Sequence, residues 1–355
     1  MTSIPPPSPS SAAASSASSS NSNDRSGYRA GYRGPAAAAR LQPPESGRSG
    51  RSADTKDLPL QRGKSGDASG AAHAAERRVR GRGNAGLLEA SRLLSDRDLA
   101  VLQIVHDHRF LSTTHVQGFL FFDHASHRTA NRICQRVLSR LEGHGLLVRP
   151  IRRIGGTEAG SVSTIWMLTS QGQRLLSLRA GLGAIGRVRE PGEGFVRHYL
   201  AIADTHLSLV EAERLRRFEL LDVAIEPASW RRYPARHGGT VTLKPDLFAA
   251  AAGPQYEAHF YIEVDRATES IPTVLKQCHF YEDYRRSGFD QDDSGLFPRV
   301  LWAVPDQQRA GKLRAAIDRD RHLDGELFIV TTIDSLADVV TAETHADAAD
   351  EGGEA

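Results

Sequence analysis

The sequence predicts an α/β protein in which two ordered parts lie between disordered tails. Three observations predict this class: a first segment without large aliphatic residues, a helical segment that ends in a hairpin pattern, and a later alternation of strands and helices. The expected parts are a basic tail, a helical unit, a linker, a mixed α/β domain and an acidic tail, over residues 1–92, 93–180, 181–194, 195–340 and 341–355.

The first segment is predicted to be disordered because of its composition. Residues 1–92 are mostly Ser, Ala, Gly, Pro and Arg, and cannot bury enough apolar surface to offset the entropy of ordering. The chain does not open with a basic stretch followed by an apolar one, so we expect no secretory signal. Two distant cysteines and the lack of a long apolar run predict a cytoplasmic protein without a membrane span.

Charge is distributed unevenly along the chain. Residues 1–92 contain 14 Lys and Arg against 7 Asp and Glu, and residues 93–180 contain 11 against 6. The remainder contains 20 against 30. A basic first half is typical of a part that binds a polyanion, and a chance distribution with an acidic tail is the alternative interpretation.

Local patterns in the unit 93–180 predict three helices, a hairpin and a closing helix. The first helix starts at Ser95, because Asp98 stands three residues later in a pattern like a capping box. The helices are expected within 95–111, 112–122, 126–145 and 170–178, and the hairpin strands within 146–154 and 162–169. This order is that of a winged helix-turn-helix, whose third helix fits a major groove and whose hairpin touches the flanking backbone.

The third helix carries the side chains expected to contact duplex DNA. Arginines recur every four residues from Arg128 to Arg140, on a face other than the apolar stripe. The residues placed for phosphates and base edges are Arg128, Thr129, Asn131, Arg132 and Arg136, joined by Arg152 and Arg153 of the wing. The alternatives are a solvated helix face, or a winged helix that binds protein.

Residues 195–340 are predicted to form a mixed α/β layered domain. Its order is a long helix, three strands, a helix, a strand, a helix and a strand. The helices are expected within 196–217, 270–288 and 306–320, and the strands within 218–227, 240–252, 258–265, 299–305 and 325–333.

Three carboxylates fall on two of these strands. Asp246 follows Pro245 on the second strand, and Glu263 and Asp265 end the third. Residues two apart on a strand point to the same face, so Glu263 and Asp265 are expected to present oxygen ligands of the kind that Mg²⁺ prefers. The alternative is structural: Asp246 caps a strand, and Glu263 pairs with Arg266.

The element order and the Pro-Asp…Glu-x-Asp spacing resemble the PD-(D/E)XK nuclease superfamily, and the resemblance implies a restriction-endonuclease-like fold. The Mg²⁺ ligands that it implies are Asp246, Glu263, Asp265 and Glu211. Asp265 stands where that superfamily has a strand Lys. Lys276 of the next helix is the candidate replacement, and Lys244 is another.

Four longer stretches within 93–340 carry a second resemblance: "LSDRDLAVLQIVHDHRFLSTTHVQGFLF", "LTSQGQRLL", "HYLAIADTHLSLVEA" and "LKPDLF…FYIEVDRATES…LKQCHFYEDYRRSG…FPRVLWAVP". Together they resemble the replication-relaxation family of plasmid-encoded proteins. This implies a plasmid-associated, DNA-binding accessory protein of replication, relaxation or mobilisation, with double-stranded plasmid DNA and a relaxase or replication initiator as partners. The alternative function is a Mg²⁺-dependent endonuclease that nicks DNA. The sequence lacks a GxxxxGK[ST] phosphate loop, which leaves an ATPase unsupported.

Overall fold

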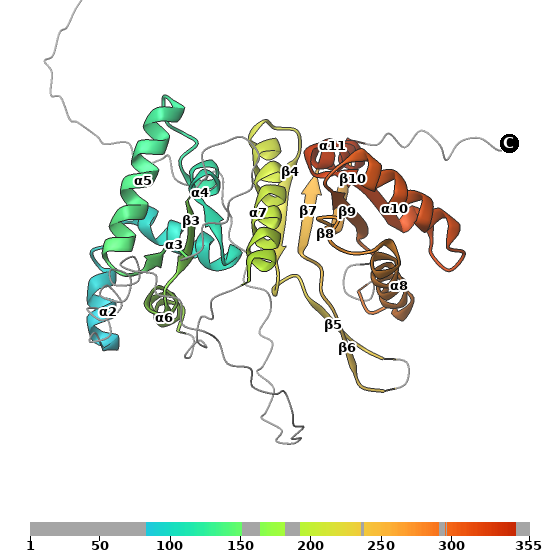
Figure 1. Cartoon of the computed structure of the whole chain (residues 1–355), viewed down its shortest axis with the longest axis horizontal. Coiled ribbons are helices and arrows are strands. Elements are labelled where there is room, and N and C mark those ends of the chain that lie inside the picture. Colours follow the sequence, from blue (N-terminus) through green and yellow to red (C-terminus); the bar gives the residue numbers. More distant parts are fainter. Residues whose placement is uncertain are drawn as a thin grey trace, which may run out of the picture. The chain divides into compact units, whose positions relative to one another are not determined.

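The structure is a computed structural model that describes residues 83–150, 164–181, 192–235, 238–290, 295 and 297–345 (Figure 1). The predictions for most of the N-terminal tail, for Arg152 and Arg153, and for the end of the acidic tail lie outside these residues. The described part is a mixed α/β protein with several sheets, as predicted.

The helical unit contains the predicted three helices, hairpin strands and closing helix. Its helices are α3 (Asp96–His108), α4 (Thr113–Leu120), α5 (His127–Gly143) and α6 (Ser170–Arg179). Its strands are β1 (Leu111–Ser112), β2 (Leu147–Val148) and β3 (Ile165–Leu168), antiparallel in the order β1-β3-β2. The capping box at Ser95 is confirmed, since Asp98 N–H donates to Ser95 Oγ (3.2 Å) and Ser95 N–H donates to Asp98 Oδ2 (2.9 Å).

Two helices lie where the sequence predicts disorder, so those boundaries are wrong. Helix α2 (Asn84–Ser91) packs against α6 and buries Leu87 within the predicted basic tail. Helix α11 (Leu336–His345) runs past the predicted boundary at 341, and its Val340 and Thr344 are fully buried. A few apolar side chains are enough to stabilise a short helix when a neighbouring element buries them. The average composition of a long segment does not reveal such local burial.

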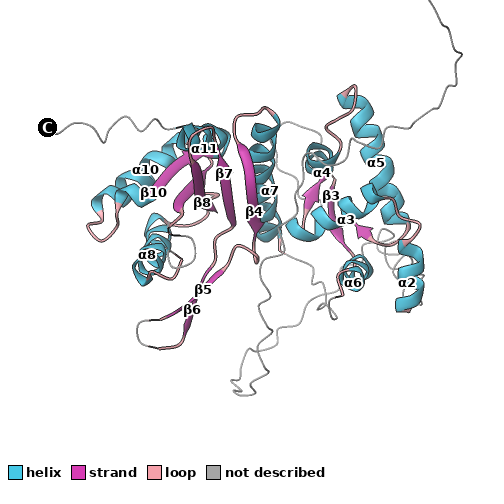
Figure 2. Ribbon diagram, turned by 180° about the vertical axis from the view of Figure 1, so that it is seen from behind, coloured by secondary structure: helices cyan, strands magenta, loops and turns pink. Residues whose placement is uncertain are grey.

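The second part is built on a five-stranded sheet with helices on both faces (Figures 1 and 2). Its strands, in the order β10-β9-β8-β7-β4, are β10 (Phe328–Thr332), β9 (Arg299–Val304), β8 (Glu257–Val264), β7 (Leu247–Ala252) and β4 (Glu219–Ile225). Strands β4, β7 and β8 run antiparallel to their neighbours in that group, whereas β8, β9 and β10 are parallel. Helices α7 (Glu193–Arg214) and α11 cover one face, and α8 (Ile271–Ser287) and α10 (Gln307–Arg319) cover the other.

The predicted strand 240–252 is interrupted at Pro245. Its first part is β6 (Thr240–Leu243), which pairs with β5 (Arg231–Pro234) in a separate hairpin, and its second part is β7. Proline has no N–H for a strand ladder. The Pro245 carbonyl instead accepts a hydrogen bond from Ser229 Oγ at 2.5 Å. Asp246 therefore lies at a corner between two sheets rather than within a continuous strand.

Helix α7 also contacts the helical unit. Gly118 of α4 approaches it so closely that an added Cβ would lie 2.8 Å from Leu207 Cδ2. Arg214 donates to the carbonyls of Gly118 (2.6 Å) and Phe119 (2.8 Å), and so ties the end of α7 to the end of α4. One hydrophobic core accordingly includes residues of α3, α4, α5, α7 and the sheet.

Candidate metal centre

The register of three antiparallel strands places three acidic residues side by side. Ile225 of β4 pairs with Leu247 of β7, and Leu247 pairs with Ile262 of β8. The next residue outward on each strand is therefore Glu226, Asp246 or Glu263. Like charges on neighbouring strands destabilise a sheet unless something compensates them.

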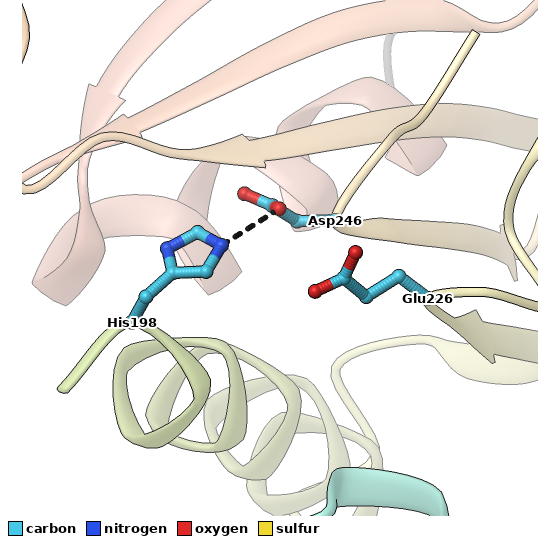
Figure 3. A group of neighbouring side chains, drawn as sticks. All are labelled: His198, Glu226 and Asp246. Carbon is cyan, nitrogen blue, oxygen red and sulfur yellow. Dashed lines mark hydrogen bonds and ion pairs between the residues drawn. The ribbon is translucent and has the colours of Figure 1, made fainter. Parts of the chain in front are cut away.

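His198 of α7 completes the group from outside the sheet. Ligand atoms of His198, Glu226 and Asp246 all lie within 4.8 Å of one another, and His198 Nε2 is 3.0 Å from Asp246 Oδ1. Figure 3 shows the three side chains pointing toward one another from a helix, a strand end and a corner. Among the described residues, this is the one group of His, Cys, Asp and Glu found with a spacing that could hold a metal ion.

Main-chain hydrogen bonds hold Asp246 in place. Val264 N–H donates to Asp246 Oδ2 at 2.8 Å, which turns Oδ1 toward His198. Glu226 N–H donates to the Asp246 carbonyl at 3.0 Å, so the two strand ends are joined directly. The Asp246 carboxylate is therefore fixed by the fold of three neighbouring segments.

The neighbours of His198 favour its charged form. Burial opposes the charged imidazolium, but the hydrogen bond and the negative charge of Asp246 outweigh it, and the pKa of His198 is raised. Glu226 adds to this effect, and Arg266 opposes it. A metal ion that binds both His198 Nε2 and Asp246 Oδ1 must displace the proton of their hydrogen bond.

Glu263 lies beside the group in a buried position. Burial, and then the charge of Asp246, raise the pKa of Glu263 well above its usual range. The Tyr281 hydroxyl donates to Glu263 Oε1, and Gln277 also hydrogen-bonds this carboxyl and opposes the shift. Gln277 and Tyr281 are four residues apart and so lie on the same face of α8. The alternative in which Glu263 pairs with Arg266 is not what the structure shows.

The sequence model that describes the replication-relaxation family matches residues 102–300, more than half of the chain. The chain belongs to the replication-relaxation family. This membership suggests a role in plasmid replication or relaxation, and the matched range includes α5, the three residues of the group and Glu263. No curated protein and no solved structure matches the chain. Among the described residues of this family member, none of the helices is long and apolar enough to span a membrane.

Asp265, predicted as a third ligand, turns away from the group in this replication-relaxation protein. Its Oδ2 lies 2.6 Å from Arg309 Nε, and its Oδ1 accepts from Ala267 N–H at 2.8 Å. Both oxygens are thus engaged, and Asp265 is nearly inaccessible. The side chain pairs with α10 and caps a turn.

The other predicted site residues do not join the group. Glu211 is exposed and lies more than three helical turns beyond His198, roughly 20 Å along α7. Lys276 is exposed on α8, and its neighbour Gln277 is the residue that reaches Glu263. Lys244 lies with its Nζ 4.7 Å from the centre of the Trp230 ring.

Five of the seven residues predicted to contact DNA lie on α5, and the other two, Arg152 and Arg153, are outside the described residues. Arg128, Thr129, Arg132 and Arg136 are exposed, and Asn131 is half-buried. Arg140, the last arginine of this row, instead pairs with Asp98 of α3 at 2.5 Å. The α5 surface therefore presents three arginines, whereas the fourth is occupied with stabilising the start of α3.

The sequence predicted no role for Glu226, and for His198 it indicated only that a histidine of the long helix could approach the site, a structural role being the more common one for such a residue. Glu226 could have been found from its position, because it is an acidic residue at the end of the first predicted strand of the domain, and Asp246 is an acidic residue on the second predicted strand. No local pattern distinguishes His198, because its role depends on where α7 crosses the sheet.

Proposed function

We propose that this protein is a divalent-metal-dependent endonuclease that nicks DNA during plasmid replication or relaxation. The observation that carries the proposal is the alignment of Glu226, Asp246 and Glu263 on adjacent strands with His198 above them. Carboxylates on neighbouring strands repel one another, and a bound divalent cation relieves this repulsion more fully than the protons of His198 and Glu263 do.

The order of elements supports the proposal. With the separate β5-β6 hairpin left out, the order α7-β4-β7-β8-α8-β9-α10-β10 agrees with a restriction-endonuclease-like arrangement, in which acidic residues of the second and third strands meet. The run α3-β1-α4-α5-β2-β3-α6, with the sheet order β1-β3-β2, agrees with a winged helix-turn-helix. We infer that α5 binds duplex DNA through Arg128, Arg132 and Arg136, with Thr129 and Asn131 beside them.

The donor set fits Mg²⁺ and Mn²⁺. Carboxylate oxygens suit both ions, and an imidazole among the ligands favours Mn²⁺ over Mg²⁺. Glu226, Asp246 and His198 would hold the ion, and Glu263 would join after losing its proton. When bound, such an ion stabilises negative charge on a phosphate and activates a water molecule.

The protein's own side chains prepare the site in two ways. Val264 N–H keeps the second oxygen of Asp246 occupied, so that one oxygen remains directed at the group. Tyr281 and Gln277 hold Glu263 while it is protonated, and both can donate to its carboxylate after ionisation. The site is therefore oriented before an ion enters it.

A second function, DNA binding without cleavage, is favoured by one observation. The strand position where PD-(D/E)XK nucleases have Lys is Asp265, and its carboxylate is paired with Arg309. In this alternative the protein is a DNA-binding accessory of replication, relaxation or mobilisation, partnered by a relaxase or replication initiator, and the acidic group is retained as a binding or structural feature.

Supercoiled plasmid incubated with the purified protein and Mg²⁺ or Mn²⁺ tests the first function against the second. The wild type is expected to convert supercoiled to open-circular DNA, and the Glu226→Gln/Asp246→Asn double variant is expected not to. Glu211→Gln is the matched control, since it removes an exposed acid of α7 far from the group. Plasmid binding in a mobility-shift assay without nicking by the wild type would refute the nuclease and support the accessory function.

A further inference from the structure

The turn that follows β8 is held in an uncommon backbone conformation. Ala267 has φ 56°, in the left-handed region that side chains other than glycine rarely adopt. The hydrogen bond from its N–H to Asp265 Oδ1 (2.8 Å) closes the turn. Such conformations persist where the surrounding structure enforces them, and they cluster at functional sites.

Arg309 fastens this turn to α10. Its Nε is 2.6 Å from Asp265 Oδ2, and one terminal nitrogen donates to the Glu269 carbonyl at 2.9 Å. The Asp265 and Arg309 side chains are only 3% and 11% exposed, so water screens the pair weakly. The two ends of the turn, Asp265 and Glu269, are therefore fixed, and Arg266, the first residue after Asp265, is held near His198.

Arg266 brings positive charge to that place. It donates to the Gly194 carbonyl at 3.3 Å, and its charge opposes protonation of His198. Arg197 lies near Arg266. Burial, and then the positive charge of Arg197, lower the pKa of Arg266. Arg197 pairs with Glu193 at 2.5 Å, but both side chains are largely exposed, so this pair contributes little. Two guanidinium groups next to a buried acidic group form a suitable environment for a phosphate.

An aromatic side chain lies one helical turn from His198. Phe195 is 44% exposed, and its ring centre lies 4.7 Å from that of Tyr199 and 6.1 Å from that of Phe110. Tyr199 is buried and bonded to Glu226, and burial followed by this hydrogen bond raises its pKa. Phe195 is thus the exposed member of an aromatic cluster whose Tyr199 contacts Glu226 of the metal centre.

We propose that Phe195, Arg266 and Arg197 form a strand-docking surface that receives an unpaired DNA strand, with a base stacked on Phe195 and a phosphate at the arginines. This inference rests on the proposed function and names its substrate. A base must expose its flat face to stack on an aromatic ring, which bases in the interior of a duplex do not do. Asp246 and Glu263 are buried, so a narrow single strand reaches them more readily than an intact duplex.

The proposal assigns Asp265 and Arg309 a positioning role. They do not touch the strand but hold the turn that presents Arg266. It also accounts for an acid in the place of the superfamily's strand Lys: the positive charge comes from the following residue, Arg266, instead.

Fluorescence anisotropy with labelled oligothymidylate, and with a labelled hairpin duplex, tests the strand-docking surface in Ca²⁺ without Mg²⁺ or Mn²⁺. We expect Phe195→Ala and Arg266→Gln each to weaken oligothymidylate binding on the order of tenfold while duplex binding changes little. Phe195→Trp should retain single-strand affinity. Phe280→Ala, which removes another exposed phenylalanine, on α8, is the matched control and should behave as wild type.

Three outcomes would overturn the proposal: no binding of oligothymidylate by the wild type, unchanged affinity in Phe195→Ala, or an equal loss for single strand and duplex. Thermal unfolding of each variant identifies a loss that comes from misfolding, and Phe195→Trp then decides the question. The two proposals fail separately. If nicking requires Asp246 but Phe195→Ala binds oligothymidylate as the wild type does, only the proposal of the strand-docking surface is refuted. If Phe195→Ala weakens oligothymidylate binding but the wild type does not nick plasmid DNA, only the proposed nuclease function is refuted.

Discussion

A buried histidine pair should make this protein sensitive to mild acid. His108 of α3 and His206 of α7 are both buried, their rings are stacked, and His108 Nε2 lies 3.0 Å from His206 Nδ1. A hydrogen bond between two ring nitrogens needs one donor and one acceptor, so at least one imidazole must be neutral. Protonating both would place two cations in contact inside the core.

The size of the effect follows from the pKa values. Burial, together with the charge of Arg214, lowers the pKa of His206 to about 3, and burial followed by His206 and His115 lowers the pKa of His108 well below 6.5. In the unfolded chain both titrate near 6.5, so their contribution to stability is present above that pH. For His206 this contribution is lost as pH falls from 6.5 toward 3, at about 1.4 kcal/mol per pH unit, and His108 adds a loss in the same direction.

His206 alone therefore costs roughly 2 kcal/mol between pH 6.5 and pH 5, a substantial part of a typical unfolding free energy of about 5–15 kcal/mol, and His108 adds to this loss. Urea denaturation followed by tryptophan fluorescence at several pH values measures this slope. His206→Gln removes one titrating group and should reduce the slope by about 1.4 kcal/mol per pH unit. His144→Gln, at an exposed position after α5, is the matched control.

Equal slopes for wild type and His206→Gln would refute the reasoning. Carboxylates elsewhere also contribute to acid unfolding, but they are common to both proteins and cancel in the comparison. A reduced slope in His144→Gln of the same size would show that burial is not the cause.

Three further predictions concern the metal centre, the turn and α5. Mn²⁺ affinity, measured by calorimetry, should rise with pH above 4.5 and be accompanied by proton release, because burial and then the charge of Asp246 raise the pKa of Glu263 and metal binding must displace that proton; Glu263→Gln should weaken the dependence. Arg309→Gln should lower the unfolding free energy by about 3 kcal/mol, since it leaves Asp265 buried without its partner; no change would show that the pair is not structural. Arg132→Gln should weaken duplex binding and reduce its salt slope by about 1 if the arginine contacts a phosphate.

Local sequence patterns predicted most elements because caps and periodicity act within a few residues. The Ser95–Asp98 box and the α5 arginine row are of this kind. The same reasoning failed at Pro245, where a run of strand-forming residues is divided between two sheets. It also failed for α2 and α11, whose burial depends on partners distant in the sequence.

For the candidate site, the sequence by itself determined which strands end in acids: Asp246 and Glu263 follow from a Pro-Asp pair and a Glu-x-Asp triplet. Only the tertiary structure decided which acids meet. The register of β4, β7 and β8 brings Glu226 opposite Asp246, and the crossing of α7 brings His198 above them. Asp265, two residues beyond Glu263, meets Arg309 of α10 instead. Strand register and helix crossing arise from packing between distant segments, so no local spacing contains them.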